Sequence, residues 1–412
     1  MKRILLLLTA VIASLTPLRA QQIEATLGDS SFVSIITCGP GSEFYTTWGH
    51  SAIRVCDPEL GLDLVYNYGT FDFNTKHFYL KFAQGRLDYC LSRGSYENFL
   101  LEYTFENRDV WEQQLNMTRQ ERNNLFVLLE ENYRPEHRYY KYDFFRDNCA
   151  TRVRDMINNA LCHRALFVES YPAHPRTYRD MLYAPTETYL LWWRLGVDLV
   201  LGQRCDKVCS NMECMFAPPE MMRQVDTTLV KVKDAFGQWV NTDSTLLVAK
   251  SHPVVGTLPH PSPSMNPTRC FWLLFVVVLA LTVIEWAHNN NAGDKKRTWR
   301  LVWLDEILFW ITGIASLILL FLWFGSDHYC TKANWNLLWA NPLFIYFAIR
   351  LRRSNRWVLL AGMVCLLAVL TGFWWIPQTL NTAVFPIALT LLLRLTDKFR
   401  SPFHISENNT SI

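Results

Sequence analysis

The hydrophobic and polar positions of this chain divide it into three regions. An apolar run from Ile4 to Ala13 follows Lys2 and Arg3 and leads into a polar segment. From there to about residue 250, apolar and charged residues are mixed, and from Phe271 onward apolar residues come in long blocks. The mean hydropathy of +0.02 therefore averages two segments of different character.

The first region has the features of a secretory signal peptide: a basic start, a short apolar run and a small residue, Ala20, at its end. We predict that residues 1–20 form this peptide. An uncleaved membrane anchor is the alternative, although the apolar run is short for a membrane crossing. The chain up to about Pro267 is therefore expected outside the cytoplasm.

Five apolar blocks in the last third each approach the length that crosses a bilayer. The basic residues test this number independently, because Lys and Arg near span ends concentrate on the cytoplasmic side. Basic clusters at 295–300, 350–356 and 394–400 follow the first, third and fifth blocks, whereas the other two connections carry only Lys332. An exported domain, five spans and a cytoplasmic tail at 401–412 fit this distribution. Within a transmembrane domain of residues 269–400, the predicted spans are 270–287, 305–325, 336–350, 357–375 and 379–395.

A proline-rich stretch separates the two main regions. Five prolines lie between residues 251 and 268. Proline at this density favours polyproline II and is incompatible with a helix interior or a central strand. We predict a semi-rigid spacer over residues 251–268, which holds a periplasmic domain of residues 21–250 close to the membrane surface.

Composition narrows the partners and the redox chemistry. The net charge of +3 gives no indication of nucleic-acid binding, and export argues against that partner. Eight of the eleven cysteines lie in the exported region. Cys205, Cys209 and Cys214 are close together but have neither C-x-x-C spacing nor a neighbouring histidine, so inert thiols or a disulfide are favoured over zinc. We expect neither a metal nor a cofactor.

Alternation of apolar and polar residues predicts a β-hairpin early in the exported region. Ser51 to Val55 alternates, and Leu62 to Gly69 follows a turn at Asp57-Pro58 and Gly61. Further along, Phe78 to Phe82 and Leu87 to Leu91 predict short β or irregular elements.

Two helices follow in the same region. The first begins at Thr118, where residues 118–121 (Thr-Arg-Gln-Glu) form a capping box, and Leu125, Leu128 and Leu129 supply the buried stripe. The second begins at Cys149, where Asn148 or Asp147 can cap the first turn. Apolar residues recur there at helical spacing: Val153, Met156 and Ile157.

His50 and Cys149 are the strongest candidates for chemistry. A helix N-terminus lowers the pKa of a thiol through its unpaired N–H groups, and the same groups can stabilise an oxyanion. We expect His50, at the start of an edge strand, to approach the thiol and take its proton. Hairpin geometry places Asn67 on the neighbouring strand, where its side chain can orient the imidazole.

Each of these residues also has a structural interpretation. A cysteine in a helix is more often a small buried hydrophobic residue than a nucleophile. His50, flanked by Trp48 and Ile53, could be structural, and Asn67 between two tyrosines could be a turn residue. The combination of a strand-start histidine, an adjacent asparagine and a helix-start cysteine in one exported domain favours a thiol site.

The two motifs resemble a known family. Residues 49–53 (Gly-His-Ser-Ala-Ile) and 148–153 (Asn-Cys-Ala-Thr-Arg-Val) are similar to the motif pair of circularly permuted NlpC/P60 papain-like enzymes, in which histidine precedes cysteine. The lecithin:retinol acyltransferase group belongs to that branch. The chain resembles still more closely the Lnb lipoprotein N-acyltransferases of Bacteroidota, through residues 66–73 (Tyr-Asn-Tyr-Gly-Thr-Phe-Asp-Phe) and 341–343 (Asn-Pro-Leu). One departure is Asn67, where the retinol acyltransferase group has a second histidine.

The resemblance implies an α+β fold, a permuted papain-like domain followed by an all-α bundle of about five transmembrane helices. It implies N-acylation of the N-terminal diacylglyceryl-cysteine of lipoproteins. A membrane phospholipid would donate the acyl chain, a diacylated lipoprotein would accept it, and Cys149 would carry it as a thioester. His50 would move the protons and Asn67 would orient the imidazole.

Five further residues are candidates for substrate contacts. Trp48 and Tyr45 could line an acyl groove, although core packing explains them equally well. Asn148 and Arg152 flank the nucleophile in the second motif. His328 lies in a predicted connection on the same side of the membrane as the catalytic domain, where it could contact head groups.

Two other functions fit parts of the pattern. A membrane-anchored cysteine hydrolase, acting on lipid or on peptidoglycan, would use the same pair with water in place of the amine. Five apolar spans favour a lipid substrate over a cell-wall peptide. A non-enzymatic membrane protein that retains the pair as a relic is the second alternative.

Overall fold

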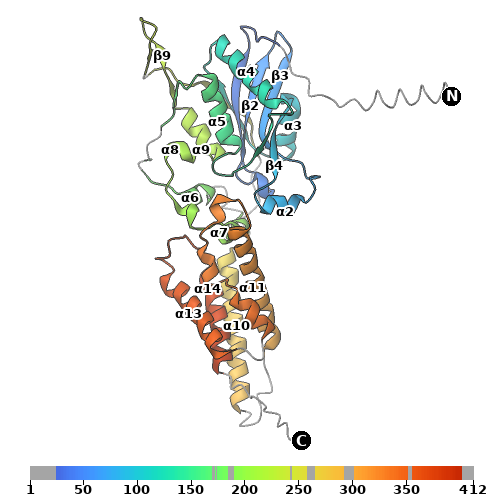
Figure 1. Cartoon of the computed structure of the whole chain (residues 1–412), viewed down its shortest axis with the longest axis vertical. Coiled ribbons are helices and arrows are strands. Elements are labelled where there is room, and N and C mark those ends of the chain that lie inside the picture. The colour runs from blue at the N-terminus through green and yellow to red at the C-terminus, as the bar shows by residue number, and fades with distance from the viewer. Residues whose placement is uncertain are drawn as a thin grey trace, which may run out of the picture.

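The computed structural model describes residues 25–168, 172, 174–183, 190–241, 244–257, 265–291, 301–350 and 355–400. The predicted signal peptide (1–20) and cytoplasmic tail (401–412) lie outside these residues. A mixed α+β domain occupies one end of the molecule, and a bundle of helices occupies the other (Figure 1). This arrangement confirms the predicted fold class.

A seven-stranded antiparallel sheet forms the centre of the α+β domain. Its strand order is β11-β5-β1-β2-β3-β4-β6. The predicted hairpin is confirmed as β2 and β3, but the expectation that His50 begins an edge strand is wrong, because β2 lies between β1 and β3. The strands are β1 (Phe32–Cys38), β2 (His50–Asp57), β3 (Leu62–Thr70), β4 (Asp88–Ser95), β5 (Val110–Leu115), β6 (Tyr139–Lys141) and β11 (Val248–Val255).

Helices cover both faces of the sheet. Alternate residues of the central strands, such as Ile35 and Ile53, pack against α4 (Arg119–Tyr133) and α5 (Cys149–Ala160). The opposite set, including Ile36 and Ala52, packs against α3 (Tyr96–Phe105). This two-residue alternation is the reason that each strand contributes to two cores.

Helix α4 begins as predicted. The Thr118 hydroxyl accepts from the Glu121 N–H, and the Glu121 carboxylate accepts from the Thr118 N–H, which together form the capping box. Leu125 and Leu129 are fully buried, whereas Leu128 is 37% exposed, so only two of the three predicted stripe residues reach the core.

Two segments differ from the sequence-based expectation. Residues 78–82 lie in a short helix, α2 (Phe78–Ala83), and not in a strand. The predicted spacer begins later than expected, because residues 251–255 continue β11 and pair with β5. Pro253 is tolerated there because β11 is the edge strand of the sheet.

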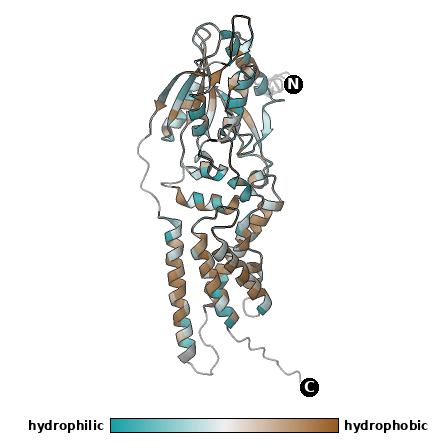
Figure 2. Cartoon of the chain, turned by 90° about the vertical axis from the view of Figure 1, so that its left-hand side faces the viewer, coloured by the Kyte–Doolittle hydropathy of each residue, from teal (hydrophilic) through white to brown (hydrophobic). Residues whose placement is uncertain are grey.

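The membrane region contains five helices among its described residues: α10 (Pro267–Asn291), α11 (Val302–Phe324), α12 (Leu343–Ile349), α13 (Arg356–Gly372) and α14 (Val384–Arg400). Figure 2 shows their strongly hydrophobic character. Two of them, α10 and α11, are long and apolar enough to cross a membrane, and α13 is a shorter apolar helix. The third predicted span, 336–350, is not one helix, because Asn341 and Pro342 separate a 3-10 turn (Trp335–Leu338) from the seven-residue α12. At about 1.5 Å per residue, α12 is too short to span a bilayer.

A buried ion cluster joins three of these helices. The Arg394 guanidinium of α14 donates to Asp305 of α11 at 2.7 Å and to Glu285 of α10 at 3.0 Å. All three side chains are almost inaccessible to solvent. Arg394 therefore belongs to the interior of the bundle. Its place in the basic cluster 394–400 had led us to expect it in a loop, and that expectation is wrong.

Short elements connect the sheet to the bundle. They include α7, which lies at the junction between the two regions (Figure 1). The remaining elements are the 3-10 helices Phe44–Thr46, Gln203–Asp206 and Tyr329–Thr331, the helices α6 (Tyr178–Tyr183), α7 (Leu191–Val200), α8 (Asn211–Cys214) and α9 (Pro218–Val225), and the two-residue strands β7 (Ala165–Leu166), β8 (Leu229–Val230), β9 (Val232–Lys233) and β10 (Trp239–Val240).

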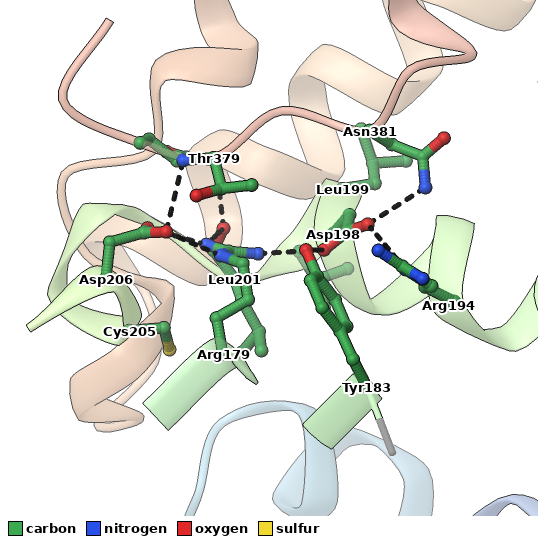
Figure 3. Close-up of polar contacts among 12 residues, drawn as sticks. Arg179, Tyr183, Arg194, Asp198, Leu199, Leu201, Cys205, Asp206, Thr379 and Asn381 are labelled. Atoms are coloured by element: carbon green, nitrogen blue, oxygen red, sulfur yellow. Dashed lines mark hydrogen bonds and ion pairs between the residues drawn. The ribbon is translucent and has the colours of Figure 1, made fainter. Parts of the chain in front are cut away.

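A second buried ion network fixes this junction. Arg179 of α6 pairs with Asp198 of α7 at 3.1 Å and with Asp206 at 2.9 Å (Figure 3). From the membrane region, the Asn381 amide donates to Asp198, and the Thr379 N–H donates to Asp206. The network therefore ties the periplasmic part of the chain to the connection that precedes α14.

Candidate active site

A cavity of about 780 Å³ lies where the α+β domain meets the membrane bundle. His50, Asn67 and Cys149 all line it, so the predicted trio belongs to one cavity. Other parts of the wall come from α7 and from the segment that follows α11, including Tyr329 and Thr331. A substrate in this cavity would contact both the periplasmic domain and the membrane-proximal part of the chain.

Cys149 is the first residue of α5 and is 6% exposed. Asn148 caps this helix: its side chain accepts from the Thr151 N–H, and the Thr151 hydroxyl accepts from the Asn148 N–H. The backbone N–H groups of Ser51, Ala150 and Cys149 itself act on the sulfur in the direction that lowers the pKa of the thiol. The start of α5 therefore presents its free N–H groups to the thiol, as helix geometry requires.

His50 is positioned by the hairpin. Its Nε2 lies 3.2 Å from Asn67 Oδ1 across the β2–β3 pair. An amide oxygen can only accept, so the proton is on Nε2, and Nδ1 is left unprotonated and able to accept a proton. Gly49, with a φ of +80°, precedes His50, and a Cβ there would lie 2.6 Å from the Cys38 carbonyl oxygen. Glycine at residue 49 is therefore needed for the entry into β2.

Gly69 also lines the cavity, and the sequence analysis did not predict it as a site residue. Its φ is +92°, and a Cβ at this position would lie 3.4 Å from Tyr142 and 3.9 Å from the Cys149 Cβ. It sits where the β3–β4 register shifts, between Asn67 and Thr70. The backbone can therefore pass directly beside Cys149.

Burial governs the protonation of the pair. It lowers the pKa of His50 to about 4, assisted by the positive charge of Arg108 and opposed by the bond to Asn67. Burial also raises the pKa of Cys149, although the three N–H groups and the Arg108 charge act in the opposite direction. At neutral pH the resting site therefore holds a neutral thiol and a neutral imidazole.

Arg108 was not anticipated from the sequence. Its Nε donates to the Gly39 carbonyl at 3.0 Å, Nη1 pairs with Glu106 at 2.9 Å, and the guanidinium lies 4.4 Å from the centre of the Tyr103 ring. It lines the cavity and is only 3% exposed. A fixed cation here favours the thiolate that forms when Cys149 is deprotonated.

Three of the five proposed substrate contacts lie at the cavity. Trp48 lines it and donates from Nε1 to the Leu182 carbonyl at 3.2 Å. Tyr45 lines it and is 55% exposed. The His328 ring also lines it, with its Nε2 2.9 Å from the Phe82 carbonyl oxygen.

The other two do not belong to the cavity wall. The Asn148 amide is used within the fold, because Nδ2 donates to the Phe144 and Phe216 carbonyls. Arg152 is held in a bidentate pair with Asp147 and lies 3.6 Å from the centre of the Tyr140 ring. Both side chains stabilise the segment around α5 and are not presented to a substrate.

The cysteines outside the site are free thiols. Cys205, Cys209 and Cys214 are fully buried in one apolar cluster together with Cys330. Among the described residues, no group of three or more His, Cys, Asp or Glu side chains could hold a metal ion.

Two family models match the chain. The model described as the Lnb N-terminal periplasmic domain matches residues 20–183, which contain His50, Asn67 and Cys149. The model described as the Lnb transmembrane domain matches residues 260–401, which contain all five helices of the bundle. No curated protein and no solved structure matches the chain.

Proposed function

Because the chain belongs to the Lnb family, whose members combine a periplasmic domain with a transmembrane domain, we propose that it is a lipoprotein N-acyltransferase. Family membership supports a membrane-anchored enzyme with its N-terminal domain in the periplasm. The proposed reaction moves an acyl chain from a membrane phospholipid to the α-amine of the N-terminal diacylglyceryl-cysteine of a lipoprotein.

One observation supports this proposal above the others. The hydrogen-bonded pair of His50 and Asn67 lines the same cavity as Cys149, and the membrane-proximal segments form other parts of its wall. A thiol, a base and an orienting acceptor are the parts that acyl transfer through a covalent intermediate requires. Contact with the membrane region suits substrates that are themselves lipids.

In the first half-reaction, His50 Nδ1 takes the thiol proton as the Cys149 sulfur attacks the ester carbonyl of the phospholipid. The N–H groups at the start of α5 stabilise the oxyanion. As the tetrahedral intermediate collapses, the protonated imidazole gives its proton to the departing glycerol oxygen. A lysophospholipid leaves, and the acyl chain remains on Cys149 as a thioester.

In the second half-reaction, the lipoprotein amine attacks the thioester carbonyl and loses a proton to His50. Collapse of this intermediate expels the Cys149 sulfur, which recovers the proton, and yields an amide. A thioester is suited to this step because amines attack it readily. Throughout, Asn67 accepts from Nε2 and keeps Nδ1 directed to the reaction.

The test is mass spectrometry of a lipoprotein's N-terminal peptide from a strain that lacks the gene. We expect N-acylation to be lost on deletion and restored by the wild-type chain but not by Cys149→Ala. Cys162→Ala is the matched control, since Cys162 is an exposed cysteine of the same domain. Restoration by Cys149→Ala would exclude the thioester route. Acylation that persists after deletion would exclude the transferase and leave the hydrolase.

A further inference from the structure

Exposed aromatic and apolar side chains gather on one side of the cavity mouth. Tyr79 is 81% exposed, Phe73 58%, Tyr45 55% and Leu80 51%. Phe73 and Phe78 lie with their ring centres 4.9 Å apart, and Tyr45 contacts Phe73 edge-on. We call this group the aromatic rim; its members are Tyr45, Phe71, Phe73, Phe78, Tyr79, Leu80 and Phe82.

Contacts with the chain that follows α11 fix the height of the rim relative to the membrane. The Asp327 N–H donates to the Gln84 carbonyl at 2.7 Å, and Arg86 pairs with Asp327 at 2.7 Å. Asp327 lies three residues after the end of α11 at Phe324. Three residues span at most about 10 Å, and the head-group layer of one leaflet is roughly 5–7 Å thick. With the end of α11 at the edge of the hydrocarbon core, helix α2 would lie at the level of the lipid head groups.

The rim is continuous with the reactive wall. Tyr45, Phe71, Phe73 and Phe82 line the same cavity as Cys149. An apolar surface thus leads from the exposed side chains of α2 to the thiol. In water these side chains would form an unfavourable apolar patch, whereas at a bilayer surface aromatic residues are stabilised.

Charged residues beside the rim match a phospholipid surface. Lys76 is exposed next to α2, and Lys81 lies within it. A lysine next to aromatic residues that enter a lipid leaflet can keep its ammonium at the level of the lipid phosphates. The combination of apolar anchors and flanking lysines is typical of interfacial binding.

We propose that the aromatic rim is a lipid-docking surface that inserts into the outer leaflet and admits a phospholipid acyl chain sideways into the cavity. The entry route rests on the proposed function, whereas docking of α2 in the leaflet does not. The occupant is a membrane phospholipid, because the rim is continuous with the membrane-spanning part of the same chain.

The test uses the full-length chain in vesicles of phosphatidylethanolamine and phosphatidylglycerol that contain a radiolabelled phospholipid. The photoreactive p-benzoylphenylalanine replaces Tyr79 in one variant and Phe236 in the matched control. Phe236 is 89% exposed and lies between β9 and β10 in the chain. Strand β9 lies at the end of the molecule farthest from the bundle (Figure 1). We expect a lipid adduct at residue 79 at least tenfold more abundant than at residue 236. Equal labelling, or no labelling at residue 79, would overturn the proposal.

A second measurement separates docking from chemistry. In a Cys149→Ala background the adduct at residue 79 should persist, because docking needs no acyl transfer. If Cys149→Ala retained lipoprotein acylation while residue 79 still crosslinked, the proposed function would fail and the docking surface would stand. If Cys149→Ala abolished acylation but residue 79 did not crosslink, the docking surface would fail alone.

Substitutions test the route into the cavity. Tyr79→Asp combined with Leu80→Asp should lower acylation of the lipoprotein at least tenfold, because two charges would have to enter the leaflet. Tyr79→Trp should retain activity, since tryptophan also favours the interface. Full activity in the double aspartate variant would refute lateral entry through the rim, and Phe236→Asp controls for a charge added far from it.

Discussion

Replacement of Asn67 by alanine gives a quantitative test of how the imidazole is held. The substitution removes the acceptor 3.2 Å from His50 Nε2 and leaves the ring free to change tautomer or rotate. A neutral hydrogen bond of this kind is worth about 1 kcal/mol net. In the transition state the imidazole is protonated and the bond is charge-assisted, about twice as strong. Because kcat depends on the difference between these two values, the loss should be about 1 kcal/mol, or roughly fivefold in kcat.

The assay is acyl transfer to a diacylated lipopeptide in detergent or vesicles, with kcat and KM determined separately. We expect kcat to fall and KM to change little, because Asn67 acts through His50. Ser92→Ala is the matched control: Ser92 pairs with Asn67 across β3 and β4, lines the same cavity and bonds to Thr70 at 2.7 Å. It should stay within about threefold of wild type.

Asn67→Asp examines the same contact by its charge. A carboxylate beside the ring would stabilise the imidazolium and raise the pKa of His50. The acid limb of the pH–rate profile should therefore move upward relative to wild type. The reasoning would be refuted by wild-type kcat in Asn67→Ala, by an effect on KM alone, or by an equal loss in Ser92→Ala.

Three further predictions follow from other contacts. Burial lowers the pKa of His50 to about 4, and only the neutral ring can accept a proton. The value of kcat/KM should therefore rise with pH through about 4 and be constant from pH 6 to 7. A rise in kcat/KM centred near pH 6.5 would show that the ring is not buried in the working enzyme. Gly69→Ala should lower kcat at least tenfold, because the φ of +92° strains any side chain in the stretch of backbone that passes beside Cys149. Wild-type rates would contradict this. Arg179→Met should lower the free energy of unfolding by about 3–5 kcal/mol, because it leaves Asp198 buried without its main cation. Thermal denaturation measures this loss. Adding Asp198→Asn to the same chain should recover part of it.

Much of the site could be predicted because its determinants are local. The capping residues of α5 adjoin Cys149 in sequence, and the hairpin that brings Asn67 to His50 needs only one short turn. The hydrogen bond between them, 3.2 Å long, lies at the end of the hairpin away from its turn. The catalytic roles of these residues remain predictions until the variants are measured.

The remaining features depend on pairing between distant segments. The position of β2 inside the sheet is set by its pairing with β1, a strand that is not part of the hairpin. Arg108 reaches the site through the Gly39 carbonyl, a contact between segments 69 residues apart. Helix α2 was missed because residues 78–82 are apolar or aromatic at nearly every position, so they show no helical periodicity.

Strand β11 could not be predicted from the proline-rich stretch 251–268 into which it extends, for a related reason. A proline lacks the backbone N–H that a central strand needs for pairing on both sides, but an edge strand can do without it. The sequence alone does not show which strand lies at the edge of the sheet. Strand β11 pairs with β5 through Pro253 because its other side faces no strand of the described sheet.

The extension of β11 also limits how the domain can turn on the membrane. The sheet is joined to α10 through its edge strand β11, which ends at Val255, twelve residues before α10 begins at Pro267. On the other side, the Gln84 and Arg86 contacts to Asp327 hold the segment that leads into β4. Together with the bonds from Asn381 to Asp198 and from Thr379 to Asp206, these contacts restrict rotation of the domain about the membrane normal. The cavity mouth therefore keeps one orientation relative to the bundle, so that the proposed lipoprotein substrate, diffusing in the leaflet, would have to approach from a fixed direction.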